Sequence, residues 1–124
     1  MVPILVVDDN QAVADFCRLT LSEAGHSVIT AHSAKEALEA LERHTIDIIL
    51  SDVRMPGVSG LDLLHLVSKG PLPPSVILMT GFDPQVELDE VRENGIALIL
   101  RKPYGSAELE NAVAQALAQA DEAA

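Results

Sequence analysis

Five residues of the types used in metal and phosphoryl chemistry follow short apolar runs in this sequence. Asp8 and Asp9 come after the first run, Asp52 after a later one, and Thr80 and Lys102 after the last two. Three carboxylates brought together would repel one another by about 1–4 kcal/mol per pair near a protein surface. Mg²⁺ relieves such repulsion, because it prefers oxygen ligands completed by waters and phosphate oxygens. With a hydroxyl and a compact ammonium nearby, the set predicts a metal-assisted phosphoryl site.

The apolar runs before these residues are the size of strands and rich in β-branched side chains. They lack a clean apolar/polar alternation, which is typical of strands buried on both faces of a parallel sheet. The four strong runs are Ile4–Val7, Ile46–Leu50, Val76–Met79 and Ile96–Leu100, and a weaker one is Ser27–Ala31. The sequence therefore predicts five short strands.

The segments between the runs carry apolar residues at helical spacing. Local signals support these helices: Gly25 is a stop, Ser33 to Glu36 is a capping box, Ser59 is a cap, and Asp83-Pro84 is a helix start. The predicted apolar positions are Val13, Phe16, Cys17, Thr20, Leu21 and Ala24; Ala34, Ala37, Leu38 and Leu41; Leu63, Leu64 and Val67; Val86, Leu88 and Val91; and Leu109, Ala112, Val113, Ala116 and Leu117.

Strands and helices thus alternate along the whole chain. Such alternation predicts parallel strands joined by right-handed crossovers, with helices covering both faces of the sheet in three layers. Ligands of doubly wound sheets bind outside the carboxyl ends of the strands. Because the polar residues follow the strands, we expect them to meet at that edge.

Composition limits the classes of function. The 124 residues suffice for one domain, and a net charge of −11 argues against nucleic acid or an anionic membrane as partner. The acidity would equally serve solubility alone. A single cysteine, Cys17, is expected in the core, and it allows no intramolecular disulfide. With neither a signal peptide at Met1-Val2-Pro3 nor a membrane-length apolar run, the protein is expected in the cytoplasm.

Four motifs together resemble the receiver domain of bacterial response regulators in two-component signalling. They are Val7-Asp8-Asp9, Ser51-Asp52-Val53-Arg54-Met55-Pro56-Gly57 with Gly60, Met79-Thr80-Gly81, and Lys102-Pro103-Tyr104. The resemblance covers about residues 3–119 and leaves 120–124 as a frayed tail. It implies the α/β flavodoxin-like (βα)5 fold, a three-layer doubly wound five-stranded parallel sheet with strand order 2-1-3-4-5.

The resemblance also implies a role for each matching residue. Asp52 is expected to accept a phosphoryl group from the phosphohistidine of a sensor histidine kinase or a histidine phosphotransfer protein. Thr80 and Lys102 would contact that group. Mg²⁺, with Mn²⁺ as a substitute, would be held by Asp8, Asp9, Asp52 and the backbone carbonyl of Arg54. Phosphorylation would switch binding of a downstream effector at the face formed by the fourth helix, fifth strand and fifth helix.

Several alternatives stay open at this point. The chain could be an interaction module that no longer uses phosphorylation, and Asp8 and Asp9 could merely cap a helix. A nucleotide- or flavin-binding enzyme would need a glycine-rich turn after the first strand, where the sequence has Asp8-Asp9-Asn10-Gln11. A phosphatase with an aspartyl intermediate would need a second acid placed to act on a leaving group, and the sequence shows none beyond Asp52. The domain is therefore expected to catalyse its own phosphorylation and dephosphorylation and not to be a turnover enzyme. Ile99 stands where receivers commonly carry an aromatic, which leaves an aromatic switch unsupported.

Overall fold

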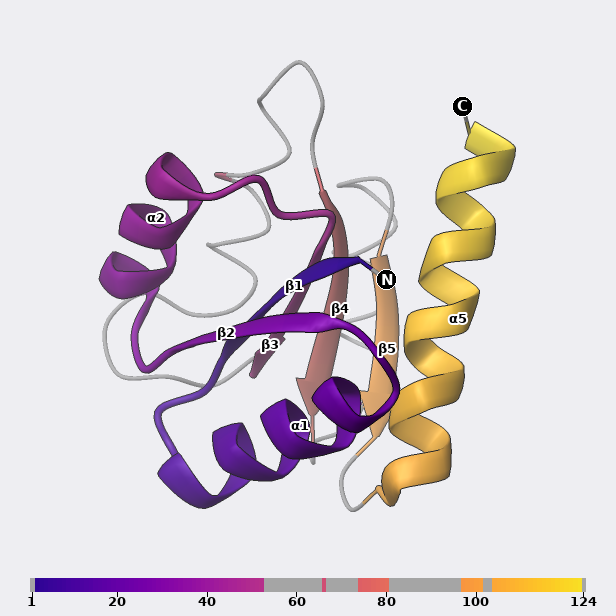
Figure 1. The fold of residues 1–124 in the computed structure, drawn as a ribbon, viewed down its shortest axis with the longest axis horizontal. Coiled ribbons are helices and arrows are strands. Elements are labelled where there is room, and N and C mark those ends of the chain that lie inside the picture. The colour runs from indigo at the N-terminus through magenta and orange to yellow at the C-terminus, as the bar shows by residue number, and fades with distance from the viewer. Residues whose placement is uncertain (1, 53–65, 67–73, 81–96, 102–103, 124) are drawn as a thin grey trace.

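The computed structural model describes residues 2–52, 66, 74–80, 97–101 and 104–123, and Figure 1 shows how these segments are arranged. The strands of this part are β1 (Pro3–Val7), β2 (Ser27–Ala31), β3 (Ile48–Asp52), β4 (Ser75–Thr80) and β5 (Ala97–Arg101). Its helices are α1 (Gln11–Glu23), α2 (Ala34–Arg43) and α5 (Ser106–Ala123). The apolar positions predicted for the third and fourth helices lie outside the described residues.

All neighbouring strands are parallel, and the sheet order is β2-β1-β3-β4-β5. This confirms the predicted doubly wound α/β sheet. β3 starts at Ile48 rather than at Ile46, and it ends at Asp52 as predicted.

The sheet is buried on both faces, as the unbroken apolar runs predict. Successive side chains of a strand point to opposite faces. On β1, Ile4 and Val6 join the core cluster under α1 and α5, whereas Leu5 and Val7 join the cluster under α2. In Figure 1, α5 runs alongside β5 and α2 lies well apart from it. The strands therefore contribute apolar side chains to the core clusters on both faces of the sheet. Polar functional groups can then be placed only at the strand ends.

The helix ends follow the local signals in the sequence. Gly25 has a φ of 96°, and it forms a Schellman motif in which Gly25 N–H donates to Ser22 O and His26 N–H to Leu21 O, both at 3.1 Å. At α2, Ser33 Oγ accepts from the backbone N–H of Glu36 at 3.2 Å, which confirms the predicted cap.

The predicted helix faces are correct in part. α5 buries Leu109, Ala112, Val113 and Ala116 as expected. On α1, however, the buried face is narrower than the apolar pattern of the sequence predicted. Ala14, Cys17 and Leu21 are buried, whereas Phe16 is 39% exposed. On α2, Leu38 lies at the edge of the stripe and is 36% exposed. None of the helices in the described ranges has the length and apolarity required to cross a bilayer.

Candidate functional site

Three carboxylates meet at the carboxyl ends of β1 and β3. One oxygen each from Asp8, Asp9 and Asp52 lies within 4.8 Å of the other two. The strand register explains this, because β1 and β3 are neighbours and Val7 pairs with Ser51, the residue before Asp52. The convergence predicted for these three acids is therefore present in the structure.

The backbone N–H, the backbone carbonyl and the side chain of Asp8 all have polar contacts. It is fully buried, and its N–H continues the ladder by donating to Ala31 O at 3.0 Å. Its Oδ1 accepts the N–H of Asn10 at 2.8 Å, and its carbonyl lies 3.2 Å from Nδ1 of His32. The carboxylate thus sits in a turn whose geometry is fixed by the end of β2, by His32 and by the N-cap residue of α1.

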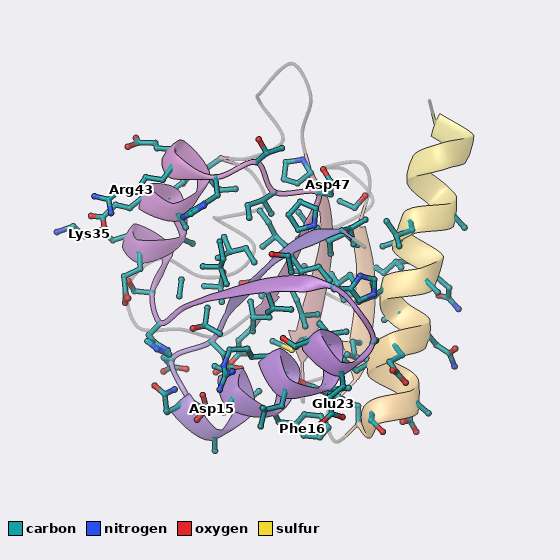
Figure 2. The ribbon with its side chains drawn as sticks, in the orientation of Figure 1. Asp15, Phe16, Glu23, Lys35, Arg43 and Asp47 are labelled. Carbon is teal, nitrogen blue, oxygen red and sulfur yellow. The ribbon has the colours of Figure 1, made fainter. Side chains whose placement is uncertain are left out.

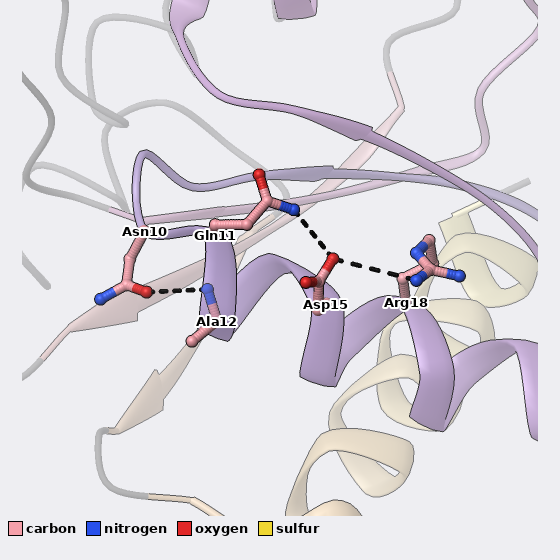
Figure 3. Close-up of polar contacts among 5 residues, drawn as sticks. All are labelled: Asn10, Gln11, Ala12, Asp15 and Arg18. Atoms are coloured by element: carbon pink, nitrogen blue, oxygen red, sulfur yellow. Dashed lines mark hydrogen bonds and ion pairs between the residues drawn. The ribbon is translucent and has the colours of Figure 1, made fainter.

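Neither Asp8 nor Asp9 serves as the cap of α1. That position is taken by Asn10, whose Oδ1 accepts from Ala12 N–H at 3.0 Å (Figure 3) and also from Val13 N–H at 3.3 Å. One turn further on, Gln11 and Arg18 both reach the carboxylate of Asp15 (Figure 3). The interpretation of the acidic pair as mere helix caps is therefore wrong, and both carboxylates remain in the cluster.

The donor set fits a hard divalent cation. All three donors are carboxylate oxygens, and burial increases stepwise from the exposed Asp9 through the half-buried Asp52 to the fully buried Asp8. A charge removed from water requires compensation, while the exposed side leaves room for the waters that Mg²⁺ retains. Within the residues described, no other group of three acidic, histidine or cysteine side chains comes together in this way.

Of the other predicted site residues, Thr80, Lys102 and Arg54, only Thr80 is among the residues that the structure describes. Asp52 pairs with Met79 across the sheet, so Thr80, the last residue of β4, lies one position beyond Asp52 on the neighbouring strand. Lys102 follows Arg101, the pairing partner of Thr80, but Lys102 itself lies outside the described residues, as does Arg54. The backbone therefore brings the end of β4 beside the acidic cluster.

Tyr104 is a residue whose contacts the sequence did not reveal. Its hydroxyl donates to Met79 Sδ at 2.9 Å and lies 3.3 Å from Cys17 Sγ. Burial, followed by the contact with Cys17, raises the pKa of Tyr104 well above its usual value, and the charges of Asp8 and Asp52 act in the same direction. Only its place directly after Lys102-Pro103 could have marked this residue in advance.

A doubly wound parallel sheet with an acidic cluster at its carboxyl edge defines an α/β domain whose ligand site lies at the ends of its strands. The family model of the response regulator receiver domain matches residues 4–114, and the chain belongs to that family. It is therefore a receiver domain of two-component signalling, as its motifs predicted.

Individual response regulators are also similar to this chain in sequence or in structure. The regulatory protein VanR of Enterococcus faecium is 33% identical over 106 residues, covering 86% of this chain and 46% of VanR. The transcriptional regulatory protein FixJ of Bradyrhizobium diazoefficiens is 32% identical over 121 residues, covering 98% of this chain and 59% of FixJ. A receiver domain from Clostridium thermocellum superposes with a TM-score of 0.90 at 28% identity, and each chain is covered completely. The chain spans less than two thirds of these two curated relatives.

Proposed function

We propose that this receiver domain accepts a phosphoryl group on Asp52 in a Mg²⁺-dependent reaction and signals through a change in partner binding. The observation that supports this most directly is the approach of the Asp8, Asp9 and Asp52 carboxylates to within 4.8 Å. A phosphorylation-independent interaction module would have no need to hold three repelling charges together.

The proposed metal ligands are Asp8, Asp9, Asp52 and the backbone carbonyl of Arg54, with Mn²⁺ as a substitute for Mg²⁺. When bound, the ion offsets the negative charge that spreads over the phosphoryl oxygens during transfer. The buried Asp8, fixed by Asn10, would keep the ligand set in place before the donor arrives.

The proposed chemistry is a direct transfer. A carboxylate oxygen of Asp52 forms a bond to phosphorus while the bond from phosphorus to the donor's imidazole nitrogen breaks. The electron pair of the broken bond stays on that nitrogen. Thr80 would donate its hydroxyl to a phosphoryl oxygen, and Lys102 would neutralise another. Domain and donor thus each react once per signal, which is the behaviour of a signalling domain rather than of a turnover enzyme.

The proposed donor is a sensor histidine kinase or a histidine phosphotransfer protein. The proposed output is binding of an effector at the face that includes β5, α5 and the predicted fourth helix. The proposed location is the cytoplasm, because a sequence whose one cysteine is Cys17 can form no disulfide of its own and suits a reducing compartment.

The test is incubation with acetyl phosphate and Mg²⁺ followed by intact mass measurement. We expect one added phosphoryl group, which is lost when EDTA is present and in Asp52→Asn. Asp47→Asn is the matched control, because Asp47 is exposed just before β3 begins and lies at the far end of the molecule from α1 (Figure 2). A wild-type protein that stays unmodified with donor and metal in excess would overturn the proposal.

A further inference from the structure

The Tyr104 hydroxyl joins two sulfur atoms from different elements. Met79 on β4 and Cys17 on α1 lie 2.9 and 3.3 Å from the oxygen. Methionine sulfur only accepts hydrogen bonds, so the phenolic proton goes to Met79. The Tyr104 oxygen is then the acceptor for the thiol of Cys17. The three groups form one directed chain, from Cys17 through Tyr104 to Met79.

This chain lies inside the core cluster beneath α1 and α5. Cys17 and Met79 are both fully buried, and Tyr104 packs against the same cluster. Phe16 on α1 lies beside the tyrosine ring, with ring centroids 6.2 Å apart and planes inclined by 52°. Phe16 was predicted to lie in the core, but it is partly exposed at the surface of α1 (Figure 2) and packs against Tyr104 there.

The position of Tyr104 in the chain links this contact to the proposed site. Met79 directly precedes Thr80 and pairs with Asp52. Tyr104 follows Lys102 by two residues, and the strand before it ends at Arg101, the partner of Thr80. Two residues span only about 7 Å even when fully extended. Whatever fixes Arg101 and Tyr104 therefore limits where Lys102 can lie.

The chain after Tyr104 is also fixed. Gly105 N–H donates to Glu108 Oε2 at 3.0 Å, and Gly105 O accepts from Leu109 N–H at 3.1 Å, which starts α5. Tyr104 is therefore tied to β4 and α1 through its side chain and to α5 through its successor.

We propose that Tyr104 is a positioning residue: its hydroxyl, held between Met79 on β4 and Cys17 on α1, anchors the chain two residues after Lys102 and so restricts where Lys102 can lie relative to Thr80. This inference rests on the proposed function, because it gives Tyr104 the task of aligning the two groups proposed to contact the phosphoryl group. It acts on the transfer rate and not on metal affinity, since the three acids of the cluster lie at the ends of β1 and β3, whereas the Tyr104 hydroxyl contacts β4 and α1.

The test compares Tyr104→Phe with the wild-type chain. The variant keeps the ring and removes only the hydroxyl. At saturating Mg²⁺ and acetyl phosphate, we expect the maximum rate of Asp52 phosphorylation to fall roughly two- to tenfold, the range that corresponds to one neutral hydrogen bond. Mg²⁺ affinity, measured by titration calorimetry, should stay unchanged.

A second variant tests the partner of the hydroxyl. Met79→Leu conserves volume and removes the acceptor. We expect it to slow transfer as well, and the double variant should be no slower than Tyr104→Phe alone, because both changes remove the same contact. Ile77→Val is the matched control, since Ile77 is buried in the same cluster on β4. Its loss of a methylene should lower stability and leave the transfer rate unchanged.

The outcomes separate the two proposals. A wild-type chain that takes no phosphoryl group defeats the proposed function. A wild-type chain that is phosphorylated at the same rate as Tyr104→Phe defeats the positioning role alone. Equal losses of rate and Mg²⁺ affinity, or a slowing in Ile77→Val as large as in Met79→Leu, would show a general loss of packing and would also overturn it.

Discussion

Asp8 Oδ1 accepts the backbone N–H of Asn10 at 2.8 Å, in the turn that joins β1 to α1. Asp8 and Asn10 have different roles, one in the acidic cluster and the other at the N-terminus of α1. Asp8 turns inward to the acidic cluster, and Asn10 turns to the helix, where it caps the N–H groups of Ala12 and Val13. Because the bond from Asn10 to Asp8 uses the backbone, the side chain of Asn10 can be changed without removing it.

Asn10→Ala should therefore separate folding from metal binding. Loss of an N-cap side chain costs about 0.5–2 kcal/mol, and we expect a decrease of that size in the free energy of unfolding by urea. Mg²⁺ affinity should be retained, because Asn10 N–H still orients Asp8. Ser33→Ala at α2 is the control, because it removes the cap of a different helix, where the Ser33 hydroxyl accepts from Glu36 N–H, and we expect a comparable loss of stability. A strong loss of Mg²⁺ affinity in Asn10→Ala alone would contradict this division.

Asp8→Asn should stabilise the metal-free domain and abolish its response to Mg²⁺. The amide keeps an oxygen for Asn10 N–H and removes one of three mutually repelling charges. We expect a higher melting temperature without metal, whereas Mg²⁺ should raise the melting temperature of the wild-type chain only. Thermal unfolding with and without Mg²⁺ measures both effects. If Asp8→Asn still gained stability from Mg²⁺, Asp8 would not be a ligand.

The sequence predicted the acidic cluster because that prediction needs only strand order and strand ends. β1 and β3 are parallel neighbours, so Asp8 and Asp52 have to emerge at the same edge. The start of a strand was less predictable: the apolar run begins at Ile46, whereas the pairing of β3 with β1 begins at Ile48.

Side-chain partners could not be predicted in the same way. Cys17 and Tyr104 are 87 residues apart, and nothing in the helical period of α1 indicates that a thiol there meets a hydroxyl. Phe16 was assigned to the core because its type is apolar, yet its position on the helix turns it toward the Tyr104 ring at the surface. Such contacts depend on how α1 packs against the chain after β5, which spacing alone does not determine.

Gly25→Ala should destabilise the domain, whereas Gly105→Ala should be better tolerated. Gly25 has a φ of 96°, and a Cβ added there would meet nothing within 4 Å, so the cost is backbone strain of about 1–2 kcal/mol and not a clash. At Gly105 a Cβ would meet only the carboxylate of Glu108, at 3.0 Å, which is the end of a flexible side chain. Urea unfolding of both variants measures the difference, and equal losses would contradict the role of Gly25 in ending α1.

The last prediction concerns alkaline pH. Tyr104 is the sole tyrosine and the chain has no tryptophan, so phenolate absorbance reports this residue alone. Its pKa is raised in the folded state by burial, by the contact with Cys17 and by the nearby carboxylates. The folded state therefore holds the proton more tightly than the unfolded chain, whose tyrosine titrates near pH 10. The stability that this provides is fully present below about pH 10 and decreases as pH rises further, because only the unfolded chain then gains by releasing the proton.

We accordingly expect no phenolate signal from the folded protein near pH 10, and its appearance only at higher pH together with unfolding. Urea unfolding across this range should show stability decreasing with pH in the wild-type chain and a flatter dependence in Tyr104→Phe, which has no proton to release at this position. Full titration of Tyr104 near pH 10 in a chain that is still folded by circular dichroism would mean that the hydroxyl is open to solvent. It would then not be held between Cys17 and Met79, and the anchor proposed for Lys102 would be lost with it.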